Sequence, residues 1–213
     1  MTRTGEGLRE RKKRAMRRQL SDTAMTMFLE RGFEAVRVAD VAEACGVSEK
    51  TVFNYFPSKE ALLLDRLEAM ADALHHHLAD PAVPPVAAML RILDDELAGL
   101  ETTLTAAGDH DHALTTYRRF GDLIRDTPSL RAYRSDVADR YVDVAAEALA
   151  SRTGLERTDP EAQITAAALI GLWRIQFHGL RTHLRPGHPI PEAVATVADQ
   201  VRRAAGLLER GLT

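Results

Sequence analysis

Apolar residues recur along most of this chain at steps of three and four residues, the spacing that places them on one face of an α-helix. Leu20, Ala24, Met27 and Phe28 form the first such face, and Gly32 follows it as a helix C-cap would. Later stretches with the same spacing are residues 86–104, 112–127, 130–149, 160–183 and 191–210. No segment alternates as a strand does. The pattern therefore predicts an all-α fold of about nine helices.

Prolines and small polar residues mark where these helices stop. Pro57 ends one short helix, and Ser58 can cap the next, which the pattern predicts to continue through residues 62–78. Residues 79–85, ADPAVPP, cannot be helical throughout. We expect an N-terminal domain of residues 1–57, which includes an arm at residues 1–8, and a C-terminal helical bundle of residues 58–213.

Residues 37–56, RVADVAEACGVSEKTVFNYF, have the spacing of two short helices packed across a tight turn. Gly46 suits the left-handed turn position, and Ser48 can cap the second helix. This arrangement predicts a helix-turn-helix, in which the second helix reads bases in the major groove. Its outward-pointing residues are Glu49, Lys50, Thr51, Phe53 and Asn54.

Residues 10–68 also resemble a known family. The order of a basic helix, GFEAVRVADVAEACGVS and then KTVFNYFPSKEALL is similar to the DNA-binding domain of tetracycline-repressor (TetR) type regulators. The resemblance implies DNA contacts from Arg37, Ser48, the outward face of the second helix, Tyr55 and a phosphate-contacting lysine at Lys59. Two residues depart from the family pattern: Arg37 stands where Thr or Ser commonly caps, and Phe53 stands where a phosphate-binding Tyr is common.

The net charge of −3 is distributed unevenly along the chain. Residues 1–20 hold eight Lys and Arg against two Glu, and residues 1–60 hold twelve basic against nine acidic side chains, or +3. The remainder carries 16 − 22 = −6. A basic head on an acidic body directs the head toward phosphates, which supports double-stranded DNA as the partner.

Other chemistries find little support in the sequence. The single cysteine excludes an internal disulfide framework, and no signal segment or membrane-length apolar run is present, so a cytoplasmic protein without membrane contact is expected. Enzyme signatures are missing, and neither catalysis nor a cofactor is expected. His75, His76 and His77 diverge around a helix and cannot share a metal ion, and Asp109 to His112 are expected in a polar loop. Cys45 is expected on the packed face of the helix-turn-helix.

Aromatic residues of the C-terminal part offer a candidate pocket for a small organic effector. They lie on three helical stretches and are interspersed with arginines: Tyr117, Phe120, Tyr133, Tyr141, Trp173 and Phe177, with His178 beside them. Helical bundles bind ligands between helices, with apolar walls and a few polar anchors. The alternative is that these aromatics are ordinary core, and only the family resemblance favours a pocket.

The last two helical stretches are expected to form a homodimer interface as a four-helix contact. Ala167 and Gly171 are small enough for close approach, and a seam of 3-4 spacing is formed by Val194, Val197, Val201, Ala204 and Leu208. The leading interpretation is a ligand-responsive repressor that binds a palindromic operator as a homodimer and is released by its effector. The alternatives are an effector-independent DNA-organising protein and a helical enzyme or carrier with an incidental helix-turn-helix.

Overall fold

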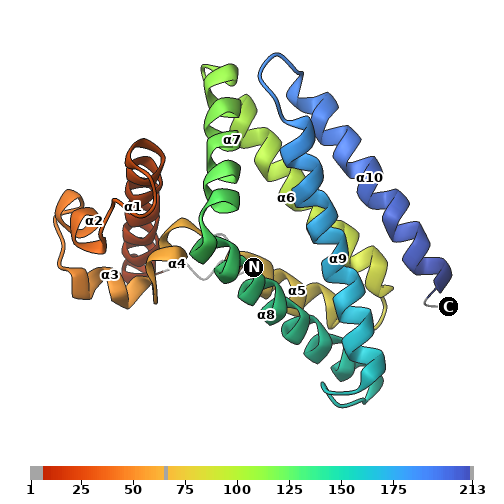
Figure 1. The fold of residues 1–213 in the computed structure, drawn as a ribbon. Coiled ribbons are helices and arrows are strands. Elements are labelled where there is room, and N and C mark those ends of the chain that lie inside the picture. The colour runs from red at the N-terminus through yellow and green to blue at the C-terminus, as the bar shows by residue number, and fades with distance from the viewer. Residues whose placement is uncertain (1–6, 65–66, 212–213) are drawn as a thin grey trace. The chain divides into compact units, whose positions relative to one another are not determined.

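Ten helices and no strand make up the described part of the chain, residues 7–64 and 67–211 of a computed structural model (Figure 1). The all-α prediction is confirmed. The helices are α1 (Leu8–Arg31), α2 (Val38–Ala44), α3 (Glu49–Tyr55), α4 (Lys59–Leu63), α5 (Leu67–Leu78), α6 (Pro85–Thr105), α7 (His110–Asp126), α8 (Pro128–Thr153), α9 (Pro160–His183) and α10 (Ile190–Gly211). None of these helices is long and apolar enough to span a bilayer.

The chain divides into two compact units. Unit 1 comprises residues 1–65 with 123–131, and unit 2 comprises residues 66–122 with 132–213. The single helix predicted from Ser58 to residue 78 is instead two helices, α4 and α5, which belong to different units. The domain boundary predicted at residues 57 and 58 stays a prediction, and the expected arm at residues 1–8 lies largely outside the described residues.

Unit 1 is held together by a small core in which α1 packs against α2 and α4, and α2 packs against α3. Fully buried Phe28 of α1 meets Phe33 with ring centroids 4.9 Å apart. Gly32 ends α1 with a φ of 86°, and its N–H donates to the Phe28 carbonyl at 2.9 Å. Other buried core residues are Leu20, Ala24, Val36, Val41, Val52, Phe56 and Leu62. Burial of each large side chain contributes about 1.5–3 kcal/mol, which is enough to fix three short helices that would not form alone.

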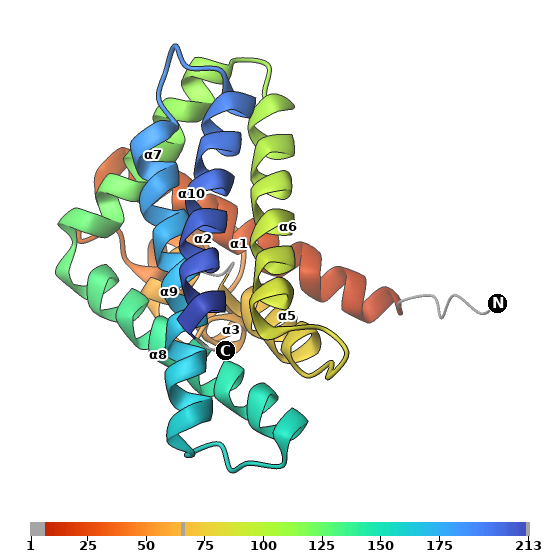
Figure 2. The ribbon, with the colours of Figure 1, turned by 90° about the vertical axis from the view of Figure 1, so that its right-hand side faces the viewer.

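Unit 2 is a bundle in which α10 packs against both α9 and α6, and α5 packs against α6 (Figure 2). The proline-rich segment after α5 is a turn within this unit, and the Arg152 guanidinium holds it by donating to the carbonyls of Leu78, Pro81 and Val83 at 3.4, 3.4 and 2.8 Å.

The helix α7 begins two residues before the start that the sequence predicts, which corrects the expected loop at residues 109–112. The backbone N–H of His112 donates to Asp109 Oδ1 at 2.9 Å, so Asp109 caps a helix that starts at His110. Asp111 accepts from the N–H of Gly187 at 3.0 Å. These carboxylates therefore serve the backbone, and no group of three metal-ligating side chains occurs in residues 7–64 and 67–211.

Candidate nucleic-acid interface and effector site

The two helices of the predicted helix-turn-helix are joined by the turn at Gly46. Gly46 has a φ of 68°, a left-handed conformation that costs other residues about 1–2 kcal/mol. Val47 N–H then donates to the Ala42 carbonyl at 3.0 Å, which closes the turn. Ser48 caps α3, because its Oγ accepts from the Thr51 N–H at 3.1 Å. Cys45 is half-buried, and its Sγ donates to the Gln19 carbonyl at 4.0 Å, so the thiol is partly sheltered.

The exposed face of α3 carries four of the residues predicted to meet DNA. Glu49, Lys50, Phe53 and Asn54 are exposed, and Phe53 keeps half of its surface open to solvent. Val52, which is 1% exposed, anchors the opposite face in the core. Ser48 is also exposed, whereas Thr51 and Tyr55 are half-buried. Phe53 is an unusual residue to leave in water, because burial of an aromatic ring is favourable.

Arg37 precedes α2 and takes part in its cap through Asp40. The Asp40 carboxylate accepts from the Arg37 backbone N–H at 2.8 Å and from the guanidinium at 2.9 and 3.3 Å. The hydrogen bond from the Arg37 side chain is the main cause that lowers the pKa of Asp40 below its ordinary value. The Arg37 side chain remains 79% exposed, so its ion pair is a weak surface one that a phosphate could replace.

Lys59 occupies the first position of α4, where the resemblance implies a phosphate contact. Its ammonium lies 4.2 Å from the centroid of the Phe33 ring and 5.7 Å from that of Phe28, as cation–π contacts do. The residue is half-buried. Aromatic packing thus holds the ammonium beside the N-terminus of α4, whose Ser58 cap accepts from the Ala61 N–H at 3.2 Å.

Basic residues of α1 add to the charge of this unit, and one of them has a structural role instead. Arg17 donates to the Tyr55 carbonyl at 3.0 Å, and its guanidinium lies 4.8 Å from the Phe56 ring centroid. It therefore fixes the end of α3 to α1. Arg11, Lys12 and Lys13 are exposed and provide positive charge.

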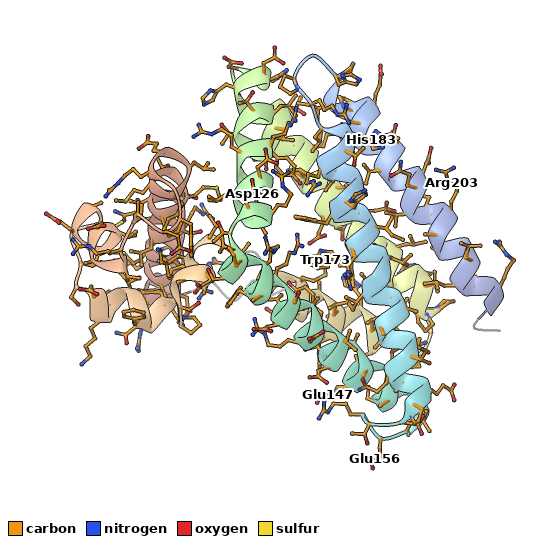
Figure 3. All side chains as sticks on the ribbon, viewed as in Figure 1. Asp126, Glu147, Glu156, Trp173, His183 and Arg203 are labelled. Atoms are coloured by element: carbon orange, nitrogen blue, oxygen red, sulfur yellow. The ribbon has the colours of Figure 1, made fainter. Side chains whose placement is uncertain are left out.

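Three of the seven residues predicted for an effector pocket come together in unit 2. The rings of Tyr141 on α8 and Trp173 on α9 meet edge to face at 5.5 Å, and Phe177 lies 6.3 Å from Trp173. Trp173 is labelled on α9 in Figure 3. Tyr141 and Trp173 are buried, and Phe177 is half-buried. Tyr117, Phe120 and Tyr133 are half-buried, and His178 is exposed.

A polar pair that sequence reasoning missed lies beside these aromatics. Gln176, which is 2% exposed, donates from Nε2 to Glu96 Oε2 on α6 at 3.1 Å, and its buried Oε1 has no hydrogen-bond partner among the described residues. A buried amide oxygen left unpaired costs about 1–3 kcal/mol, unless a ligand or water supplies a donor. Gln176 follows Trp173 by three residues on an otherwise apolar helix face. This polar residue among apolar ones is the feature of the sequence that could have indicated a polar site in the core.

Glu96 has an unusual environment for a carboxylate. Desolvation raises its pKa to about 7, although the hydrogen bond from Gln176 acts in the opposite direction. The residue as a whole is exposed, but its carboxyl group faces fully buried Gln176, and this local environment governs the titration. Burial, and to a smaller extent the negative charge of Glu96, raises the pKa of the Tyr141 phenol.

Comparison with known proteins agrees with this geometry. Residues 20–65 match the family model described as bacterial regulatory proteins of the TetR family, and residues 97–212 match the model of the MftR C-terminal domain. The chain is 30% identical over 171 residues to the HTH-type transcriptional regulator TcmR of Streptomyces glaucescens, which covers 74% of this chain and 69% of TcmR. This chain belongs to the TetR family of bacterial transcriptional regulators.

Two further similarities accompany this assignment to the TetR family. A protein named as the mycofactocin biosynthesis transcriptional regulator MftR, from Mycobacterium tuberculosis, is 29% identical over 157 residues, or 72% of this chain and 73% of MftR. A crystal structure of a TetR-family regulator from Mesorhizobium loti MAFF303099 aligns with a TM-score of 0.49 at 18% identity, covering 92% of this chain and 97% of that one.

The seam predicted to join two copies of this TetR-family chain is largely internal. Val194, Val197 and Val201 are buried within a single chain, at 7%, 0% and 2% exposure. This corrects the expectation that they face a partner, because a 3-4 seam packs equally well against the chain's own α6 and α9. Ala204 and Leu208 are half-buried against the same core.

The predicted dimer interface also includes Ala167 and Gly171, which lie on the outer face of α9 and remain available for a partner. Ala167 is exposed, and a Cβ on Gly171 would meet no atom within 4 Å. Ile164 and Ile175 on the same face are 64% and 38% exposed. These four residues form an apolar strip, called the α9 stripe below, and Leu207 of α10 is also 64% exposed.

Unit 2 also contains a cleft, which none of the predicted aromatic residues lines. It measures about 390 Å³ and is lined by Pro84, Pro85, Val86, Leu149, Arg152, Thr153, Leu155, Glu161, Ala162, Thr165 and Glu209. None of the seven predicted effector residues lines it. Arg152 is already engaged by the turn after α5, whereas Gln176 beside Trp173 has an unmet hydrogen-bonding capacity, so the aromatic site is the better candidate for a ligand.

Proposed function

We propose that this TetR-family chain is a repressor that binds a palindromic operator as a homodimer and leaves it when a small organic effector binds unit 2. The exposed face of α3 is the observation that carries the DNA-binding part of the proposal. Lys50 and Asn54 can donate to base edges, and the exposed Phe53 ring can contact a thymine methyl group. In this view Phe53 replaces the hydroxyl contact of the family with an apolar one.

Phosphate contacts would come from residues around this face. Lys59 is held near the N-terminus of α4 by Phe33, and the exposed Arg37 can exchange its Asp40 pair for a phosphate. Ser48 and Thr51 at the start of α3, and Tyr55 at its end, can donate hydroxyl hydrogen bonds to phosphates. The Glu49 carboxylate can only accept, so its proposed contact is with a base amine. Such contacts position the protein, whereas the base contacts of α3 would provide specificity.

Dimerisation is proposed to use the α9 stripe (Ile164, Ala167, Gly171 and Ile175). Exposed isoleucines separated by small residues let a second helix approach closely, and they favour burial against a copy of the same surface. A homodimer also presents two copies of α3 to half-sites about 34–36 Å apart, which a palindromic operator requires.

Effector release requires a difference in affinity between two arrangements of the protein. A ligand that favours the DNA-incompetent arrangement by a few kcal/mol shifts the population accordingly, and no catalytic step is needed. Trp173, Phe177, Tyr141 and Gln176 are the proposed lining, because they combine apolar walls with an unpaired polar atom.

The DNA-binding proposal is tested by selecting duplexes from a random-sequence pool and measuring fluorescence anisotropy at physiological salt. We expect the selected duplex to bind at least about a thousandfold more tightly than random duplex and to contain an inverted repeat. Equal affinities would instead favour the DNA-organising alternative. Absence of DNA binding altogether would leave the enzyme or carrier alternative.

The dimer proposal is tested by Ile164→Arg in sedimentation velocity at micromolar concentration. We expect wild type at twice the 23.5 kDa of one chain and the variant at 23.5 kDa, because a charge in the α9 stripe would have to be desolvated. Ala98→Arg places the same side chain on an exposed position of α6 and is the control. A folded Ile164→Arg protein that remains dimeric would place the interface elsewhere.

A further inference from the structure

Three arginines of unit 2 lie close together without an acidic partner. Arg134 of α8 places its guanidinium 5.0 Å from the Phe177 ring centroid. Arg174 precedes Phe177 by three residues on α9 and Arg181 follows it by four, so both lie on the face of α9 that carries this ring. Burial and then these two charges lower the pKa of Arg134. None of the three makes an ion pair or a hydrogen bond to a carboxylate in residues 7–64 and 67–211. We call Arg134, Arg174 and Arg181 the arginine cluster.

Lack of acidic side chains does not explain this arrangement. Residues 61–213 have an excess of six negative charges, and other arginines of unit 2 are paired. Arg157 meets Asp143 at 2.7 Å, and Arg202 meets Asp94 at 3.1 Å. Like charges on half-buried Arg134 and Arg181 and on exposed Arg174 raise the free energy of the unliganded protein, and a bound anion would lower it.

The arginine cluster adjoins the aromatic wall of the proposed effector site. Arg134 covers one part of Phe177, whose ring lies 6.3 Å from Trp173. The aliphatic stem of Arg181 is packed against α7, because a Cβ on buried Gly121 would lie 3.7 Å from its Cγ. Arginine side chains and aromatic rings are thus adjacent on α8 and α9, and the unpaired Oε1 of Gln176 lies one helical turn from Trp173.

We propose that the effector is an amphipathic organic anion. Its flat apolar part lies against Phe177 and Trp173, and its carboxylate, sulfonate or phosphate group is bound by the arginine cluster. Guanidinium groups bind such anions through charge-assisted, often bidentate hydrogen bonds. The inference rests on the proposed function, since it specifies the chemistry of the effector in that site.

The test uses two fluorescent probes that differ only in charge. 8-Anilino-1-naphthalenesulfonate carries a sulfonate, and N-phenyl-1-naphthylamine has the same ring system without it. Binding to the full chain is followed by probe emission and by energy transfer from Trp173, the single tryptophan. We expect wild type to bind the sulfonate at least about tenfold more tightly than the neutral probe, as a charge-assisted hydrogen bond predicts.

Variants then locate the anion. Arg134→Gln should weaken sulfonate binding about tenfold and leave the neutral probe within about twofold. Arg174→Gln tests the same charge at an exposed position, where misfolding is not a concern, and Arg91→Gln on the exposed side of α6 is the charge-matched control. The inference is overturned if wild type binds both probes equally or binds neither, or if the two probes lose affinity together in Arg134→Gln and Arg174→Gln.

The operator measurement described above needs no probe. A chain that selects an operator but does not distinguish the sulfonate would therefore overturn the anion inference alone. A chain that prefers the sulfonate but binds no DNA would overturn the proposed function.

Discussion

Gly179 of α9 lies against α10, and its replacement by alanine measures how tightly these helices are packed there. A Cβ there would lie 3.0 Å from Gln200 Oε1 and 3.2 Å from both methyl groups of Val197. Val197 is fully buried and β-branched, so rotation of its side chain leaves one methyl in the way. Gln200 could turn aside only by giving up its 2.9 Å hydrogen bond to His183 Nε2.

The expected magnitude combines two opposing contributions. Overpacking a close-packed helix contact costs about 1–3 kcal/mol, whereas alanine is favoured over glycine inside a helix by about 1 kcal/mol. Gly99 of α6 provides the matched control, because its added Cβ would meet no atom within 4 Å and only the helix preference applies. We therefore expect Gly99→Ala to be stabilised by about 1 kcal/mol and Gly179→Ala to be about 1–3 kcal/mol less stable than Gly99→Ala.

Thermal unfolding followed by far-ultraviolet circular dichroism at one protein concentration is the assay. Each kcal/mol corresponds to roughly 2–4 °C in Tm for a chain of this size, so the two variants should differ by at least about 2 °C. Equal melting temperatures of Gly179→Ala and Gly99→Ala would show that α9 and α10 can separate without cost. That result would contradict the close contact at Gly179.

Three further predictions concern DNA binding, the core and pH. Lys59→Ala should weaken binding to all duplexes alike and make the slope of log binding constant against log salt concentration shallower by about one. Lys50→Ala should instead change the preferred operator, at a cost of about 1–3 kcal/mol in binding free energy. Competition titrations at several salt concentrations separate the two outcomes. Val201→Glu should unfold the chain rather than split a dimer, because burying a carboxylate in this core costs at least about 3 kcal/mol. Circular dichroism would then show a loss of helicity. A folded variant would contradict the burial of Val201. The pKa of Glu96 is higher in the folded than in the unfolded chain, so its contribution to stability is largest below about pH 4.5 and is lost as the pH rises to about 7. The Tm of Glu96→Gln relative to that of wild type should therefore rise across this range. A constant difference in Tm would count against the raised pKa.

The helix-turn-helix could be predicted because its determinants are local. Gly46, the Ser48 cap and the spacing of buried Val41 and Val52 lie within a dozen residues and specify one arrangement. The start of α7 was predicted two residues late, because Asp109 reads equally well as a loop residue or as a cap. Nothing in the periodicity marked the end of α4 either, since the apolar spacing continues across it.

Features that depend on which helices meet could not be derived in this way. The seam of Val194, Val197 and Val201 has the period of a helix packed along its length, but periodicity does not say whether the neighbour is the same chain or a copy. Glu96 and Gln176 are 80 residues apart in sequence, so their pairing depends on the placement of α6 against α9. The arginine cluster likewise joins α8 to α9, because the Arg134 guanidinium lies over the Phe177 ring.

The helix α9 presents all three surfaces of the proposed mechanism. Trp173 and Gln176 face the aromatic and polar residues of α8 and α6, Arg174 and Arg181 belong to the arginine cluster, and Ile164 and Ile175 form part of the α9 stripe. A helix moves as a rigid element, so an anion that draws α9 toward Arg134 also shifts the stripe on its outer face. Effector and dimer geometry would then be linked, and by reciprocity dimerisation would change the affinity for the anion. The sulfonate probe should therefore bind wild type and monomeric Ile164→Arg with different affinities, and identical affinities would require another route from the effector to the DNA.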